Sequence, residues 1–222
     1  ALMWVLISRS FLKIATATGK TIKKKYRETV ARKRGVRSAL LHKEFARFVS
    51  SPNYMLNCGL GILLVPVLGI ALLIKGNTLM LVMNELFGKN SGSAAVVLFT
   101  AVCAVASMND TAAPSISLEG KSLWTLQSLP VRPLDVLMAK LNMQLILTGV
   151  PVIICMLCAA FMFTPLQFVS AFVSALTFVL LLALFDLFVG LKMPNLNWTS
   201  EITPIKQSGG VMIAMLGGFI YT

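Results

Sequence analysis

Residues 117–140 have the sequence SLEGKSLWTLQSLPVRPLDVLMAK and form a polar, amphipathic insert between two apolar runs. The insert is too long for a tight connection and carries its own helix start and stop signals. The run after it, residues 141–163, is long enough to cross a bilayer. The run before it, residues 93–108, is shorter, so we expect its ends to extend into flanking residues. This arrangement predicts a membrane protein that exposes a structured insert at one surface.

The composition favours lipid over water as the surrounding solvent. Hydrophobic residues make up 57% of the 222 residues and charged residues only 13%, whereas a soluble domain carries about a quarter charged residues. The fold class is therefore predicted to be all-α, a polytopic transmembrane helical bundle. The formal net charge of +12 does not indicate a nucleic-acid partner, because the basic residues flank the apolar runs and no arginine-rich or aromatic nucleic-acid module is present.

The four cysteines lie inside apolar runs and are interpreted as packing residues. Cys155 and Cys158 have the C-x-x-C spacing, but the only histidine, His42, is far away in the sequence. Structural zinc sites need about four nitrogen or sulfur ligands. We therefore expect no metal and no cofactor.

Five apolar runs define the predicted spans. Pro66 is expected to kink the first span. Residues 1–12 are typical of the cytoplasmic end of a helix that began upstream, so we expect this chain to be a piece of a longer protein. We divide it into residues 1–52, with a basic arm and an elbow helix, and residues 53–222, a bundle with the insert at 109–140. The spans are residues 54–74, 93–108, 141–163 and 166–191, with a fifth that begins after residue 207.

Residues 38–49 are predicted to form an amphipathic elbow helix on the membrane surface. Its apolar residues fall near one face and its charged residues near the other. Residues 50–52, Ser-Ser-Pro, then turn the chain into the bundle. The apolar set is Leu40, Leu41, Phe45, Phe48 and Val49, and the charged set is Lys43, Glu44 and Arg47.

The positive-inside rule sets the predicted orientation. If the basic arm at residues 13–37 is cytoplasmic, the insert and the loop at residues 192–207 are cytoplasmic too. The loop at residues 75–92 and the turn at residues 164–165 then face outside, with only Lys75 and Lys89 of the twenty basic residues. We expect a multi-pass protein of the cell membrane whose arm meets anionic lipid.

Within the insert, turn chemistry predicts two short helices. Residues 109–111, Asn-Asp-Thr, are expected to terminate the preceding span, and Pro114 and Ser115 to prevent its continuation. Ser117 is a candidate N-cap, with Glu119 in the first turn. Pro130 ends this helix, and Pro133 suits the first position of a second helix that continues into the third span. The amphipathic helix serves either as a docking surface for a partner or as an interfacial helix resting on lipid, and the residues alone leave both open.

The insert resembles the membrane subunits of ABC-type exporters of the second permease class, which include bacterial permeases. Its pattern is S-x-E-G-K-x-x-W-x-x-x-S-L-P-V followed by A-K-L. A second similar segment begins at residue 194 and has the form P-x-L-x-W-T-x-E. A third, residues 43–52, is similar to the elbow before a permease bundle. The matching residues are Ser117, Glu119, Gly120, Lys121, Trp124, Ser128, Leu129, Pro130, Val131, Ala139, Lys140 and Leu141 in the insert, and Trp198, Glu201 and Lys206 in the second segment.

The resemblance implies a permease that forms the translocation pathway of an ATP-driven exporter. The insert would contact a separate ATPase subunit, and two permease halves or a homo-oligomer would build the pathway. The chain has no G-x-x-x-x-G-K-[ST] phosphate loop, so ATP hydrolysis is expected on the partner and this chain is not expected to be an enzyme. The alternative is a membrane anchor or assembly protein that transports nothing.

Asp186 is the candidate intramembrane acid, because an ionisable residue within a span is a functional candidate. It lies near the predicted cytoplasmic end, close to Lys192. A structural pairing or snorkelling role and a transport role both remain open. No Ser/His/Asp or paired-carboxylate arrangement is visible in the pattern, so no catalytic residue is assigned.

Overall fold

The computed structural model describes residues 35–87 and 91–222. Residues 1–12 and the basic arm up to residue 34 lie outside the described residues, so the predictions made for them stay predictions. Every regular element in the described part is helical, as predicted. The helices are α2 Val36–Ser50, α3 Pro52–Cys58, α4 Leu60–Phe87, α5 Ser91–Ala106, α6 Ala112–Ser117, η1 Gly120–Ser122, α7 Leu123–Ser128, α8 Pro133–Ala159, η2 Ala160–Met162, α9 Pro165–Lys192, α10 Ile202–Lys206 and α11 Gly209–Tyr221.

Three described helices are long and apolar enough to cross a membrane: Leu60–Val82, Pro133–Met162 and Pro165–Lys192. The predicted third and fourth spans are therefore confirmed as membrane-length helices. The predicted second span corresponds to a shorter apolar helix, Ala95–Ala106. The turn at Thr164 is confirmed as well, because Thr164 and Gln167 form a capping box at the start of α9.

The predicted boundaries of the first span are wrong at both ends. The chain breaks at Gly59, so α3 is separate and α4 begins at Leu60. A Cβ at Gly59 would lie 2.7 Å from the ring of Phe48, which shows how closely α2 packs there. Helix α4 also runs through Pro66 to Phe87, where a loop was predicted from residue 75. Residues 75–87 contain no proline to stop it, and only Gly76 weakens it.

The start of the insert also differs from the prediction. Pro114 does not stop a helix but lies in the first turn of α6, where a missing backbone N–H costs no hydrogen bond. Ser117 ends α6 and is not an N-cap. The second half of the insert is as predicted: α7 ends at Ser128, and Pro133 begins α8.

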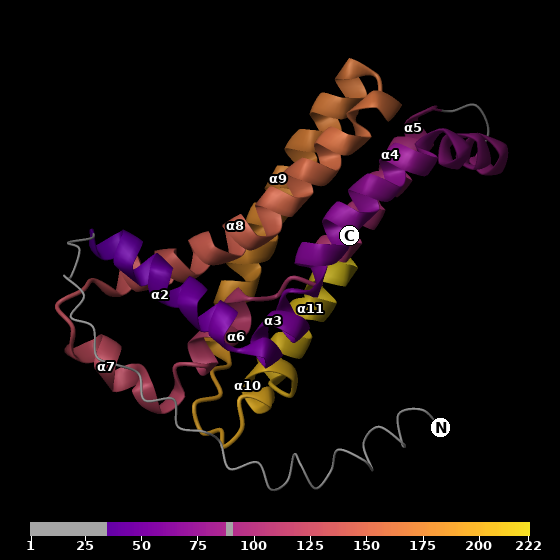
Figure 1. Cartoon of the computed structure of the whole chain (residues 1–222). Helices are drawn as coiled ribbons and strands as arrows, with labels where there is room; N and C mark the ends of the chain where they lie inside the picture. The colour runs from indigo at the N-terminus through magenta and orange to yellow at the C-terminus, as the bar shows by residue number, and fades with distance from the viewer. Residues whose placement is uncertain (1–34, 88–90) are drawn as a thin grey trace, which may run out of the picture. The chain divides into compact units, whose positions relative to one another are not determined.

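Helices α4, α5, α8 and α9 share one apolar core (Figure 1). Close glycine contacts hold it together: a Cβ at Gly69 of α4 would lie 3.0 Å from the Cα of Cys155 in α8. Cys103 and Cys155 are buried members of this core, in agreement with their predicted packing role. Its buried residues are Val65, Leu72, Leu98, Val102, Cys103, Ala106, Val152, Cys155, Met156, Ala159, Ala175, Phe178, Val179 and Leu182.

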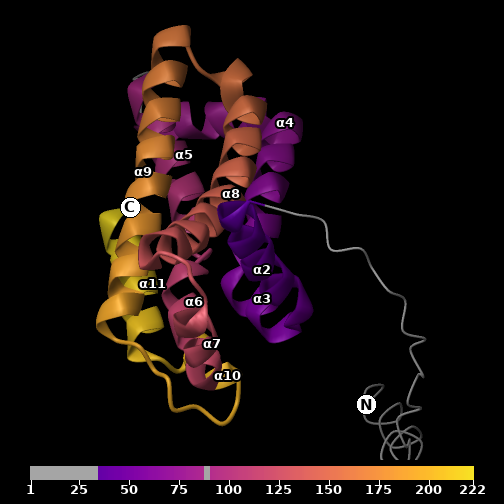
Figure 2. The same ribbon diagram turned by 90° about the vertical axis from the view of Figure 1, so that its left-hand side faces the viewer.

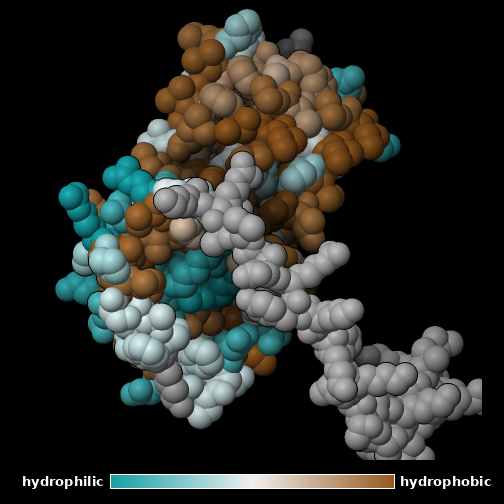
Figure 3. Space-filling view, turned by 60° about the vertical axis from the view of Figure 1, so that its left-hand side comes forward, coloured by the Kyte–Doolittle hydropathy of each residue, from teal (hydrophilic) through white to brown (hydrophobic). Residues whose placement is uncertain are grey.

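The short helices gather at one end of this bundle. Figures 1 and 2 both place α3, α6, α7 and α10 together near the lower ends of the antiparallel helices α8 and α9, with α2 beside the first part of α8. Figure 3 shows hydrophobic surface over the long helices and more hydrophilic surface at the end that carries the short ones. This polarity is what a bundle with one structured interfacial end requires.

Candidate functional site

The three segments singled out in the sequence meet at the end that carries the short helices. The elbow helix α2 packs against α8, and the segment after α9 packs against the insert. Side-chain hydrogen bonds and ion pairs join all three. The site is therefore a single assembly of insert, elbow and C-terminal loop.

Lys140 is the centre of the assembly. Its Nζ lies 2.7 Å from Oε1 of Glu119 in the insert and 3.2 Å from Oε1 of Glu44 in α2. It also donates to the carbonyl oxygen of Ser115 at 3.1 Å. The three charged residues are at most 3% exposed. A buried ammonium shared by two carboxylates fixes three elements to one another, because removing one member leaves an uncompensated charge.

Two further cations surround this cluster at its accessible edge. Lys43 Nζ lies 3.4 Å and Arg47 Nη1 lies 3.6 Å from Oε1 of Glu119. Burial by itself raises the pKa of Glu119, but Lys140, Lys43 and Arg47 more than offset this, and its pKa falls below the ordinary value. Glu119 is therefore held ionised at neutral pH.

The prediction of which residues of the elbow helix are buried and which are exposed is wrong. Leu40, Glu44 and Phe48 form the buried stripe of α2, whereas Val49 is 68% exposed. Glu44 had been assigned to the charged, exposed face. It is buried because it lies one turn after Leu40 and one turn before Phe48, and because Lys140 on α8 supplies the opposite charge.

Trp198 connects the C-terminal loop to the insert. Its indole N–H donates to the carbonyl oxygen of Ser117 at 2.7 Å, and the Ser117 hydroxyl accepts from the backbone N–H of Asn195 at 3.0 Å. Gly120 has a φ of +41°, which L-residues rarely adopt. A Cβ there would also lie 2.9 Å from Nε1 of Trp198, so the indole needs a glycine at this position.

The remaining residues of the second segment reach α3 and the exposed surface. Glu201 accepts a hydrogen bond of 2.9 Å from the hydroxyl of Ser51, the residue that caps α3. Lys206 ends α10 and is exposed. It lines a cavity of about 310 Å³ together with Asp110.

Helix α7 projects from the assembly with no buried residue. Trp124 is 67% and Leu129 is 47% exposed, and Ser128 and Pro130 are exposed too. Cavities of about 510 and 500 Å³ flank the helix, the first shared with α2 and the second with α8. The side chain of Lys121 lies outside the described residues. An exposed tryptophan on an amphipathic helix suits either a partner or a headgroup layer.

Asp186 lies apart from this assembly, inside the bundle. It is 1% exposed, and its Oδ2 accepts a hydrogen bond of 2.9 Å from Nε2 of Gln144. It forms no ion pair with Lys192 or with any other cation in the described part of the chain. The expected pairing near the membrane edge is therefore replaced by an amide contact.

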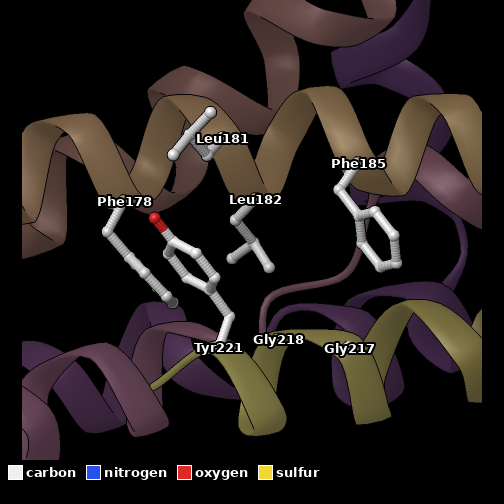
Figure 4. A pocket seen from close by; sticks show the side chains of 7 residues that line it. All are labelled: Phe178, Leu181, Leu182, Phe185, Gly217, Gly218 and Tyr221. Carbon is white, nitrogen blue, oxygen red and sulfur yellow. The ribbon is translucent and has the colours of Figure 1, made fainter.

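A separate apolar cavity of about 280 Å³ lies between α9 and α11 (Figure 4). Tyr221 stacks on Phe178 with ring centroids 5.8 Å apart, and a Cβ at Gly217 would lie 2.4 Å from the ring of Phe185. The lining offers almost no polar group that would select a ligand. Among the described residues no cluster of three or more His, Cys, Asp or Glu side chains is placed to hold a metal ion.

Sequence reasoning missed Glu44 as an insert contact and Gln144 altogether. Glu44 was hidden because an acid beside Lys43 and Arg47 is typical of a solvated face. Gln144 could have been noticed as an amide within an apolar run, four residues after Lys140. That spacing places both side chains on the same face of α8.

Comparison with known proteins gives one match. A family model described as "Membrane protein of 12 TMs" matches residues 1–221, nearly the whole chain. No curated protein and no solved structure matches the chain.

Proposed function

We propose, from the premise that the chain belongs to the family of membrane proteins of 12 TMs, that it is the permease component of an ATP-driven ABC exporter. It forms part of the translocation pathway, and its insert docks a separate ATPase subunit. A multi-span membrane protein is consistent with a transporter. The exporter assignment rests on the sequence resemblance and on the site described above.

The observation that carries this proposal is the meeting of the three resembling segments. They are far apart in the sequence, yet Lys140 joins the insert to the elbow, and Trp198 joins it to the C-terminal loop. Residues that only contact lipid need no such buried connections. A docking element that must transmit force needs them, since coupling passes through rigid, packed contacts.

The geometry also provides a path for that force. A partner that moves α7 acts on η1 and on Glu119 directly. Glu119 is bound to Lys140, which belongs to the membrane-length helix α8. Glu44 carries the same displacement to α2. A movement at the surface therefore reaches a span and the elbow together, without breaking the ion cluster.

The orientation and assembly follow from the same proposal. The insert and elbow face the cytoplasm of the cell membrane, where the ATPase is located. Two permease halves, in one chain or in two, enclose the pathway. The chain itself hydrolyses no ATP.

Site-specific photo-crosslinking tests the proposal. A photoreactive amino acid replaces Trp124 in one variant and Leu166 in the other, both in the full-length protein in cells. Leu166 is the matched control because it is 82% exposed at the start of α9, in the turn opposite the insert. We expect the Trp124 position alone to capture a protein that an ATP photoaffinity probe also labels. Capture of lipid alone at both positions would favour the non-transporting anchor.

A further inference from the structure

A buried polar cluster lies between the end of α5 and the start of α6, and it is distinct from the Lys140 ion cluster. Residues 107–111 leave the helix there, and all except Met108 are buried. Tyr54 donates its hydroxyl to the carbonyl oxygen of Thr111 at 2.6 Å. An interrupted helix at membrane depth is tolerated where it is enclosed by protein, and such breaks are where transporters hold ions.

Gln144 organises this cluster and is fully used. Its Nε2 donates to the carbonyl oxygen of Asn109 and to Oδ2 of Asp186. Its Oε1 accepts from the backbone N–H groups of Thr111 and Ala112 at 2.7 and 2.9 Å, and from the Thr111 hydroxyl. The amide therefore has no capacity left for further oxygens nearby.

Four side-chain oxygens around it have no hydrogen-bond partner and are buried. Asp110 is 5% exposed, Asn109 and Thr148 are at most 1%, and Asp186 is 1%. The side chain of Asn109 packs closely against α4, because a Cβ at Gly61 would lie 2.7 Å from its Oδ1. The unpartnered oxygens are Asp110 Oδ2, Asp186 Oδ1, Asn109 Oδ1 and Thr148 Oγ1, and the Nδ2 of Asn109 is unpartnered as well. A buried polar atom left without a partner is destabilising, and more so if it is charged.

No positive charge from the described residues neutralises the two carboxyl groups. Lys140, one turn before Gln144, is occupied by Glu44 and Glu119. Lys206 lines the same cavity as Asp110 but forms no ion pair with it. Carboxyl and amide oxygens with excess negative charge suit a hard cation. The thiol of Cys58 lines the same cavity as Asp110.

We propose that this interruption is a binding site for an alkali-metal cation, held between the carboxyl groups of Asp110 and Asp186 with Asn109 as a neutral oxygen donor. The cavity of about 310 Å³ that Asp110 lines opens beside Lys206 of α10. This cavity reaches Asp110, whereas Asp186 and Asn109 lie outside its lining. One bound monovalent cation offsets one of the two negative charges and joins α9 to the break between α5 and α6. This inference does not depend on the exporter assignment.

Thermal unfolding of the purified full chain in detergent tests the site. The probes are Na⁺ and K⁺ in choline chloride at constant ionic strength and fixed pH 8. At about a hundredfold excess over Kd, binding to the folded state alone is expected to raise Tm by roughly 5 °C or more. Choline is too large for the site and serves as the ionic-strength control.

Two carboxamide variants assign the response to these residues. Asp110→Asn and Asp186→Asn are each expected to lose the cation-dependent rise. Each is also expected to unfold no earlier than wild type in choline, because an uncompensated buried charge has been removed. Glu85→Gln is the matched control, an exposed carboxyl on α4, and its response stays that of wild type.

The titration of the wild-type protein tests the proposal even if a variant does not fold. A Tm that is the same in Na⁺, K⁺ and choline overturns the proposal, because the carboxyl pair would then be neutralised by protons alone. A rise that survives in both Asp variants overturns it too, since the ion would be binding elsewhere.

Discussion

Replacing Lys140 by methionine is the sharpest perturbation of the insert. The ammonium is 2% exposed and lies within 3.2 Å of two carboxylates. Removing one partner of a buried ion pair costs about 3–5 kcal/mol, because the remaining charge is uncompensated. Lys43 and Arg47 stay within 3.6 Å of Glu119, so we place the loss at the lower end, about 3 kcal/mol.

Thermal unfolding in detergent measures this loss. About 3 kcal/mol corresponds to a Tm decrease of roughly 6–12 °C for a protein of this size. Lys43→Met is the matched control, since its side chain is 38% exposed and such pairs contribute about 0–1 kcal/mol. The triple variant Lys140→Met, Glu44→Gln, Glu119→Gln should recover part of the stability, because no carboxylate is left buried without its ammonium. Lys43 and Arg47 lose their acidic partners in this variant but lie at the accessible edge of the cluster.

The reasoning is refuted if Lys140→Met and Lys43→Met lower Tm equally. It is also refuted if the triple variant is less stable than Lys140→Met alone. Either result would mean that the buried ion cluster does not fix the insert to α8 and α2.

Three further predictions concern packing, turn geometry and pH. Gly190→Ala places a Cβ 2.6 Å from the carbonyl oxygen of Ala113. It should lower the free energy of unfolding by about 1–3 kcal/mol, because α6 is forced away from α9. In the control Gly149→Ala the new Cβ meets nothing nearer than 3.9 Å, so Tm should be unchanged or raised. Gly120→Ala should displace Trp198, seen as altered indole fluorescence in a variant that lacks the other tryptophans; unchanged fluorescence would contradict the contact. The pKa of Glu119 is lowered on folding, so its contribution to stability is complete above about pH 4.5 and is lost as the pH falls further. Glu119→Gln should therefore flatten the plot of stability against pH in this range. An equally steep plot for the variant would count against the ion cluster.

The sequence predicted the helix class and the long spans because these depend on local chemistry. Apolar runs of sufficient length, Pro133 at a helix start and the capping pair Thr164 and Gln167 act within a few residues of one another. Predictions failed where the burial of a residue depends on a partner from another segment. Glu44 is buried because of Lys140, 96 residues away.

The break between α5 and α6 shows the same limit. The helix ends at Ala106, close to the predicted end at residues 108–111, but a new helix then runs through Pro114, and Gln144 holds the chain between the two helices. Nothing in the sequence of residues 107–111 indicates that the amide of Gln144, on α8, binds this segment. The docking residues were located by the resemblance, whereas the ion cluster that fixes them required the fold.

The affinity of the Trp124→Ala variant for the ATPase tests the central claim most directly. The full-length protein is reconstituted in lipid nanodiscs, and binding of the ATPase that co-purifies with wild type is measured beside Tm. Because Trp124 is 67% exposed, Tm should change by less than about 2 °C, while affinity should fall at least tenfold, or about 1.4 kcal/mol. Unchanged affinity for the ATPase in this stable variant would contradict the assignment of the insert as its docking site.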